Sequence, residues 1–505
     1  MSSGSWLDMF GWTPSTLCLL IVTLAVAVLY LYKNIGTYHR NRYGVKYHQI
    51  SGNILMEVNF RHKLANWLRQ YGETFGLQSG SQLVLVTANL DLWRYILIKD
   101  FSNFIDREPK IMSSTPFFNS LFFSSGREWR KQRQILSPTF TSGKLKYISK
   151  SVQKSAQDLT DYLETQAKNG STVLKKDVCG RYTSEIIAKT AFGLDAKFIA
   201  EEDAEFYEYS KNIFDFKDRG GLSKLIADFL QRIPFVERMS TEVFKLQYFE
   251  PIKLTTNKYF DVILQNTIRG KRLQQRNFCS RKDAPKVIPK LAYEEMLGHS
   301  MLVIFAGMET TATTLQMCFY ELAANSEVQD KVFQEITQVV KSDTPTLEEL
   351  NSLIYTQQVL DETLRLYPPV PSVKRIAQET LTYSGVTIPK GATVVLPYFS
   401  ALKDPRFFKD PDTFNPNRFS PKEKEKLDPL AFCVFGHGPR ICLGMRLAYL
   451  ELKQALVHVI RKLRVVLNDE TEPKRGSDGV LFKEHNLLVP EKPVALLFEL
   501  RETSQ

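Results

Sequence analysis

Regularly spaced cysteines are missing from this chain of 505 residues. The six cysteines are scattered, with no Cys-x-x-Cys and no zinc-like spacing, so the sequence predicts neither a disulfide framework nor a structural zinc site. This usage fits a reducing compartment. A Gly-x-Gly-x-x-Gly fingerprint is also missing, which argues against a nucleotide site within the chain itself. The cysteines are Cys18, Cys179, Cys279, Cys318, Cys433 and Cys442.

Motifs of nucleic-acid recognition are missing as well, although the net charge is +11. No repeat of aromatic and basic residues accompanies that charge, which fits acidic partners or anionic lipid at least as well as nucleic acid. With 43% hydrophobic and 24% charged residues, the chain is globular rather than disordered. Its length allows either one large unit or several domains.

Charged residues are lacking over residues 16–32, TLCLLIVTLAVAVLYLY, which have about the length of a short transmembrane helix. A cleavable signal peptide is the alternative, but the N-terminal flank holds no Lys or Arg and no small-residue cleavage site follows. Basic residues follow the run instead, so the positive-inside rule predicts a luminal N-terminus and a cytosolic body. The sequence thus divides into residues 1–32 with the anchor, a basic linker (33–50) and a folded body (51–505).

The ten residues FGHGPRICLG, which end at Gly444, carry the strongest signal in the chain. Glycine and proline disfavour regular structure before Cys442, and a helical pattern follows it. Cys442 is therefore expected near a helix N-terminus, where free N–H groups and the helix dipole favour a thiolate. Such a thiolate can hold a haem iron from one side. A cysteine beside a loop is otherwise more often buried and inert.

The spacing decides between these two interpretations. The pattern Phe-x-x-Gly-x-Arg-x-Cys-x-Gly is complete in Phe435, Gly438, Arg440, Cys442 and Gly444, and it resembles the haem-binding signature of cytochrome P-450 enzymes. Three further motifs match that family in its order, although each alone would fit ordinary packing. They are Trp-x-x-x-Arg (Trp129, Arg133), Ala-Gly-x-Glu-Thr-Thr at residues 306–311, and Glu-x-x-Arg (Glu362, Arg365) with Arg418 in a later meander.

The resemblance implies the P-450 fold, which is mainly α-helical with a smaller β-rich lobe, preceded here by one N-terminal transmembrane helix. Haem b would lie between two long helices. The stretches 442–448 and 490–494 look closest to the clan that holds the vertebrate family 3 drug and steroid oxidases and thromboxane synthase. The end of the chain, residues 487–493 and 494–499, is predicted to form a final hairpin.

The resemblance also implies roles for individual residues. Cys442 would be the metal ligand, while Glu309 and Thr310 would deliver protons as the catalytic pair. The residues that bind the cofactor would be Trp129, Arg133, Arg375, Phe435, Arg440 and Gly444. A structural triad would be Glu362, Arg365 and Arg418. The apolar walls of a substrate pocket, for which ordinary core packing is the alternative, would be Phe117, Phe118, Phe305, Ala306, Val370, Val373 and Leu487.

The implied activity is a haem-thiolate monooxygenase that inserts one oxygen atom from O2 into a steroid, fatty acid or xenobiotic. Electrons would come from NADPH-cytochrome P-450 reductase, with cytochrome b5 as a further partner, at the endoplasmic reticulum membrane. Two alternatives stay open: a haem-thiolate lipid-peroxide isomerase, against which Thr310 argues, and a non-catalytic haem-binding sensor. The mixed apolar and basic stretch 222–239 either dips into the membrane or packs on the body.

Overall fold

The structure is a computed structural model, and it describes most of the chain from residue 42 onward. The predicted membrane anchor lies outside the described residues except for five helical positions between 18 and 26, and the stretch 222–239 lies wholly outside them. The described ranges are 42–49, 60–79, 82–107, 116–170, 176–200, 204–213, 254–276, 291–469, 471, 482–484, 487–491 and 494–501.

Helices dominate the described chain, as the resemblance implies. Short 3-10 segments include η5 (Pro116–Asn119) and η9 (Gly438–Arg440), and a π-helical segment, η3, covers Tyr95–Lys99. The α-helices are α2 (Phe60–Tyr71), α3 (Leu90–Arg94), α4 (Gly126–Leu136), α5 (Ser142–Lys168), α6 (Lys176–Ile187), α7 (Glu205–Asn212), α10 (Leu254–Arg276), α11 (Tyr293–Ala324), α12 (Ser326–Val339), α13 (Leu347–Ser352), α14 (Ile354–Leu366), α15 (Tyr398–Leu402), α16 (Pro421–Lys424) and α17 (Met445–Lys462).

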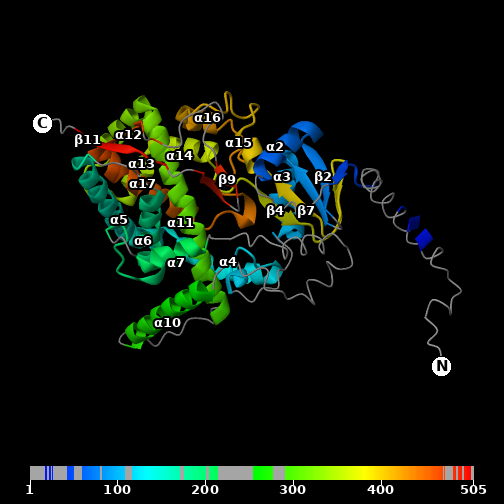
Figure 1. Cartoon of the computed structure of the whole chain (residues 1–505), viewed down its shortest axis with the longest axis horizontal. Coiled ribbons are helices and arrows are strands. Elements are labelled where there is room, and N and C mark those ends of the chain that lie inside the picture. The colour runs from blue at the N-terminus through cyan, green and yellow to red at the C-terminus, as the bar shows by residue number, and fades with distance from the viewer. Residues whose placement is uncertain are drawn as a thin grey trace.

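The longest of these helices, α11, crosses the middle of the molecule and packs against α6, α14 and α17 (Figure 1). Its second half is enclosed on all sides, because residues 311–322 are buried without a break. Among the described residues it is the one helix long and apolar enough to cross a membrane, but 67% of its apolar window is buried, as expected of a core helix.

The β-rich lobe is built on a five-stranded sheet in the order β1-β2-β3-β7-β4. β2 and β3 form an antiparallel pair, and β1 adds in parallel at the edge. Because Tyr43, Val45 and Tyr47 are buried, the folded body begins before residue 51. The strands are β1 (Tyr47–Gln49), β2 (Thr74–Ser79), β3 (Gln82–Thr87), β4 (Val373–Ile376) and β7 (Thr393–Leu396).

Three two-stranded sheets complete the described strands, and they correct the prediction for the end of the chain. β10 pairs with β9 and β11 pairs with β8, so the last two strands do not pair with each other. The final hairpin expected over residues 487–499 is therefore wrong. The strands of these sheets are β5 (Leu381–Tyr383), β6 (Val386–Ile388), β8 (Leu463–Val466), β9 (Phe482–Glu484), β10 (Leu488–Pro490) and β11 (Leu497–Leu500).

The two largest of the apolar cores among the described residues lie in the two lobes. The helical core gathers buried side chains such as Phe319 of α11 and Leu456 of α17. The second core, around Trp93, Leu97 and Tyr398, joins the sheet to the chain just before the cysteine loop. Since α17 of the helical core follows that loop directly, the cysteine loop lies where the two lobes meet.

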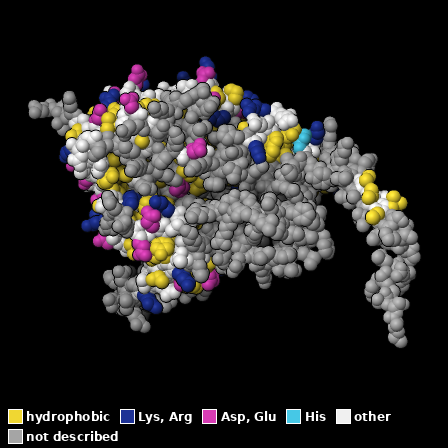
Figure 2. All heavy atoms as spheres, in the orientation of Figure 1, with side chains coloured by type: hydrophobic (Ala, Val, Ile, Leu, Met, Phe, Trp, Pro, Cys, Tyr) yellow, Lys and Arg dark blue, Asp and Glu magenta, His cyan; other side chains and the backbone are white. Residues whose placement is uncertain are grey.

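Charged side chains of both signs are interspersed over the described part of the face in Figure 2.

Candidate functional site

The loop before α17 holds Cys442 in a fixed place. The Cys442 N–H donates to the Phe435 carbonyl at 2.8 Å, which closes the loop, and η9 lies inside it. Gly438 has φ +71°, and a Cβ added there would lie 2.0 Å from the Leu97 carbonyl oxygen. Only glycine therefore lets this loop lie directly on the backbone of η3.

The Cys442 side chain is accessible to solvent, yet burial raises the pKa of its thiol. Both hold for Cys442, because a residue with many protein atoms around it can still be reached by solvent over part of its surface. The N–H groups of Gly444 and Met445 at the start of α17 act to lower the pKa, and so do the charges of Arg107 and Arg133. The expected helix N-terminus thus lies beside the sulfur and favours the thiolate.

Arginines from four separate segments surround this region. Burial lowers the pKa of Arg107 to about 9, and the charge of Arg375 adds to this effect. Burial likewise lowers the pKa of Arg440 to about 8, with Arg107 and Arg375 acting in the same direction. Burial lowers the pKa of Arg133, while the nearby Cys442 thiolate acts to raise it. The positive charges of these arginines therefore lie close enough to repel one another.

The arginine Nε atoms are the clearest sign of a missing partner. Nε of Arg107, Arg375 and Arg440 is buried and has no hydrogen-bond partner within the described part of the chain. A buried donor without a partner costs about 1–3 kcal/mol, and more when it is charged. A ligand that carries carboxylates would satisfy these groups. The residues present therefore fit haem: the arginines would hold its two propionates, and Cys442 would hold its iron.

Arg107 was not among the residues expected from the sequence. Its Nη2 donates to the Arg440 carbonyl at 3.2 Å, and its guanidinium lies 4.5 Å from the centre of the Phe122 ring. Trp129 was expected to bind the cofactor, and its ring lies 4.6 Å from the Arg440 guanidinium, mostly buried. No motif marks Arg107, so only the fold identifies it.

The middle of α11 contributes an accessible stripe to an otherwise buried helix. Val303 and Ala306 are exposed and Thr310 is half-buried, at the spacing of one helix face. The Thr310 hydroxyl donates to the Ala306 carbonyl at 2.7 Å. Glu309 is buried, with 8% of its surface exposed, and one residue along a helix points about 100° away. The expected acid–alcohol pair therefore does not share one face.

The structural triad comes together as three side chains from two segments. Glu362 and Arg365 lie on α14, and the Arg418 Nε donates to Oε1 of Glu362 at 3.3 Å from the meander. The Asn415 N–H donates to the same carboxylate oxygen at 2.8 Å. Phe435, from the start of the cysteine loop, lies 5.1 Å from the Tyr449 ring of α17. These contacts join α14 to the meander, and the start of the cysteine loop to α17.

The apolar residues expected to line a pocket fall into two groups. The Phe117 ring lies 5.4 Å from Phe305 and 5.9 Å from Phe118, which brings η5 against α11 beside Ala306. In the second group, Val370 and Val373 follow α14 and Leu487 precedes β10. Leu488 N–H donates to the Pro369 carbonyl at 2.9 Å, so distant segments meet there too.

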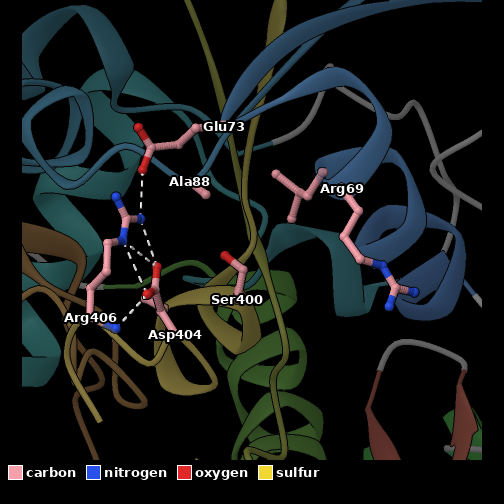
Figure 3. Close-up of a pocket in the computed structure, with 8 residues that line it drawn as sticks. Arg69, Glu73, Ala88, Ser400, Asp404 and Arg406 are labelled. Atoms are coloured by element: carbon pink, nitrogen blue, oxygen red, sulfur yellow. Dashed lines mark hydrogen bonds and ion pairs between the residues drawn. The ribbon is translucent and has the colours of Figure 1, made fainter. Parts of the chain in front are cut away.

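A surface cleft of about 350 Å³ lies elsewhere, between α2, the end of β3 and α15. Figure 3 shows Arg406 reaching both Asp404 and Glu73, at 2.6 and 2.8 Å. The cleft contains none of the residues expected from the sequence, and the charge of Arg406 is already compensated. This cleft therefore gives no support for a site of its own, and the candidate site stays with Cys442 and the arginines.

Comparison with known proteins agrees with this geometry. The sequence model of the family described as cytochrome P450 matches residues 44–498. Cytochrome P450 3A11 of Mus musculus is 33% identical over 444 residues, 85% of both chains, and cytochrome P450 3A12 of Canis lupus familiaris is 32% identical over 453 residues, 86% of both chains. Cytochrome P450 3A27 of Oncorhynchus mykiss is 30% identical over 99% of this chain and 97% of its own. The expected resemblance to family 3 is confirmed: the chain belongs to the cytochrome P450 family and is a haem-binding monooxygenase, an oxidoreductase.

Proposed function

We propose that the protein would hold haem through the Cys442 thiolate and that it inserts one oxygen atom from O2 into a lipophilic substrate. The observation that carries this proposal is the accessible Cys442 sulfur at a helix N-terminus beside buried arginines with unsatisfied N–H groups. Haem, when bound, supplies the activation of oxygen that no amino-acid side chain can carry out. The protein's own contribution is to bind, orient and exclude water.

Cys442 would hold the iron from the side of α17. Bound iron would take the place of the thiol proton, so the metal would offset the effect of burial on the pKa of Cys442. The N–H groups at the start of α17 would then stabilise the thiolate. Phe435, through its carbonyl, and Gly444, as the residue before α17, would keep the sulfur in place.

The propionates would be bound by Arg107, Arg133, Arg375 and Arg440, with Trp129 beneath Arg440. These arginines come from four different parts of the chain: α4, β4, the cysteine loop and the segment before η5. Bound haem would connect these parts, which supports the proposed role. Guanidinium groups suit carboxylates because they can donate two parallel hydrogen bonds. Binding would therefore relieve the repulsion that the protein alone contains.

Thr310 would hold a water molecule for proton delivery. Its hydroxyl donates to Ala306, so its lone pairs are left to accept from water on the accessible stripe. Glu309 would supply protons from the buried side of α11, next to Thr310 in the chain but on another face. This arrangement separates the proton source from the substrate, which suits a pocket that excludes water.

The substrate would contact apolar side chains from η5, α11 and the segment after α14. Aromatic and aliphatic walls favour a lipophilic molecule such as a steroid, fatty acid or xenobiotic. An NADPH-dependent reductase would supply electrons, because the sequence carries no dinucleotide fingerprint of its own. Cytochrome b5 would be a further partner, and the apolar run 16–32 would anchor the protein in the endoplasmic reticulum membrane.

The visible spectrum of the reduced protein with carbon monoxide tests the ligand. We expect a strongly red-shifted Soret band for the full-length protein and its loss in Cys442→Ser. Cys433→Ala is the matched control, because Cys433 is buried in the second core near the same loop. A band at the position typical of histidine-ligated haem in carefully handled wild-type protein would overturn the assignment of Cys442.

A Thr310→Ala variant tests proton delivery and separates this function from a peroxide isomerase or a sensor. We expect it to release more hydrogen peroxide per NADPH consumed with reductase present, because oxygen is activated without a placed proton donor. A peroxide isomerase would act without NADPH, and a sensor would consume none. Unchanged coupling in Thr310→Ala would remove Thr310 from the relay while leaving the thiolate assignment intact.

A further inference from the structure

Residues 116–124 form an aromatic segment that is packed closely on itself and on α11. Within it, Phe117 lies 5.2 Å from Phe123, and Phe118 lies 4.7 Å from Phe123, as ring centroids. Phe117 also meets Phe305 of α11 at 5.4 Å. The segment thus forms one wall of the proposed pocket, and its position relative to α11 decides how much room lies between them.

Gly298 of α11 lets the backbone of this segment lie directly on the helix. A Cβ added at Gly298 would lie 2.3 Å from the Pro116 carbonyl oxygen and 3.3 Å from the Ser120 nitrogen. Both atoms belong to backbone, which cannot rotate away as a flexible side chain can. Glycine within a helix costs roughly 1 kcal/mol relative to alanine, and close approach of the aromatic segment is a physical reason for it here.

His299, the next residue of α11, binds the same segment by a hydrogen bond. Its Nδ1 accepts from the Leu121 N–H at 3.2 Å, and only 6% of the side chain is exposed. Burial lowers the pKa of His299 to about 4, so the ring is neutral near pH 7 and carries its proton on Nε2. That Nε2 is buried and has no hydrogen-bond partner among the described residues.

Two other elements hold the segment from different sides. Gln132 of α4 donates to the Asn119 carbonyl at 3.0 Å. Arg440 of the cysteine loop donates to the Ser124 carbonyl at 2.6 Å and to the carbonyls of Leu121 and Phe122, each at 3.4 Å. These contacts tie the segment to α4 and to the proposed haem site. Gly298 and His299 together tie it to α11, where Phe305 forms the opposite side of the contact.

We propose that Gly298 and His299 are positioning residues that set the place of the aromatic segment on α11 and thereby select substrates by their width. The proposal rests on the proposed function, since it takes residues 116–124 as a wall of the substrate pocket. Gly298→Ala would push the backbone of Pro116 outward, and His299→Leu would release the Leu121 N–H. Either change would widen the pocket without touching the iron ligand.

Hydrogen exchange of the full-length, haem-loaded protein tests the position of the segment directly. We expect peptides covering residues 116–124 to exchange about tenfold faster in His299→Leu, while His299→Gln, whose amide oxygen can accept from Leu121, restores slow exchange. Ser300→Ala is the matched control, because the Ser300 hydroxyl bonds Met296 within its own helix. Unchanged exchange in His299→Leu, or faster exchange throughout the protein, would overturn the role of His299.

Binding of two azoles of different width, both of which coordinate haem iron, tests whether the aromatic segment selects ligands by width. We expect the ratio of Kd for a bulky azole, clotrimazole, to Kd for a slim one, 4-phenylimidazole, to fall about three- to tenfold in Gly298→Ala and His299→Leu, and to be unchanged in Ser300→Ala. An unchanged ratio beside faster exchange would mean that the segment is positioned but does not select, which contradicts the proposal. Failure of the thiolate assignment would appear separately, in the carbon monoxide spectrum.

Discussion

Arg365 donates two hydrogen bonds to the Glu362 carboxylate, from Nε to Oε2 at 2.7 Å and from Nη2 to Oε1 at 2.9 Å. Both side chains are fully buried. Arg365 also donates to the carbonyls of Leu402 and Pro411, at 2.9 and 2.7 Å. One ion pair on α14 therefore organises the chain that leads into the cysteine loop, because its remaining donors bind backbone there.

Removal of one partner of this pair should destabilise the protein strongly. We expect Glu362→Gln to lower the free energy of unfolding by about 3–5 kcal/mol, because the buried Arg365 charge loses its counter-ion. Denaturant unfolding and the haem content of purified protein would measure this. Glu379→Gln is the control, since its pair with Lys390 is exposed and worth about 0–1 kcal/mol. Equal effects of the two variants would contradict the role of the buried pair.

Gly438→Ala should prevent the cysteine loop from docking. The added Cβ would meet the Leu97 carbonyl oxygen at 2.0 Å, and φ is +71°. Gly391→Ala is the control for backbone strain alone. Gly391 has a similar φ of +80°, but a Cβ added there meets no atom within 4 Å. We expect about 1–2 kcal/mol of destabilisation for Gly391→Ala, and a larger loss together with loss of bound haem for Gly438→Ala. Normal haem content in Gly438→Ala would show that the loop tolerates the shift.

Arg107→Gln should weaken haem retention. A charged hydrogen bond contributes about 1.5–3 kcal/mol, so we expect haem to dissociate about 10- to 100-fold faster. Transfer of haem to an excess of apomyoglobin measures this rate without any assay of activity. Arg127→Gln, on the exposed face of α4, is the control and should leave the rate unchanged. If Arg107→Gln retains haem as the wild type does, Arg107 binds only the backbone of Arg440.

Acid should destabilise the protein partly through His458 of α17. Burial lowers the pKa of His458 to about 4 from its usual 6.5, and the nearby charges of Arg461 and Lys462 act in the same direction. The unfolded chain therefore binds more protons between pH 6.5 and 4, so stability is full above pH 6.5 and falls as the pH drops through this range. The effect amounts to roughly 3 kcal/mol at pH 4.

His458→Gln should remove that part of the pH dependence. We expect the difference in thermal midpoint between variant and wild type to shift in favour of the variant as the pH falls from 7 to 4. The comparison at each pH cancels the protonation of carboxylates such as Asp343 and Asp161, which lie near His458. A constant difference across this range would mean that His458 keeps its usual pKa in the folded protein.

Local spacing makes the cysteine loop recognisable from the amino-acid sequence alone. Five spaced residues around Cys442 describe a turn that only glycine can make and a helix that begins beside the sulfur. The Trp129–Arg133 and Glu362–Arg365 pairs can also be inferred from the sequence, because residues three or four apart share a helix face. The mainly helical fold follows from the length and periodicity of segments such as α11.

Pairing of the last strands could not be predicted in the same way. Alternating residues indicate that a strand forms, but hydrogen bonds between strands depend on which edges the rest of the fold brings near. β11 pairs with β8, directly after α17, and β10 pairs with β9. For β11, the nearest strand in sequence, β10, is therefore not the partner. The different burial of Glu309 and Thr310 has a related reason. Which face of α11 is buried depends on the elements packed against the helix, and these are far away in the sequence.

The family, the loop around Cys442 and the mainly helical character of this protein follow from the amino-acid sequence, because each depends on residues close together in the chain. The contacts by which Arg107 joins the arginines around Cys442, and by which Gly298 and His299 hold residues 116–124, arise only in the folded chain. Those contacts join positions far apart in the chain: His299 meets Leu121, and Arg440 meets Ser124. Such contacts leave no local pattern, because the packing of α11, the aromatic segment and the cysteine loop creates them together.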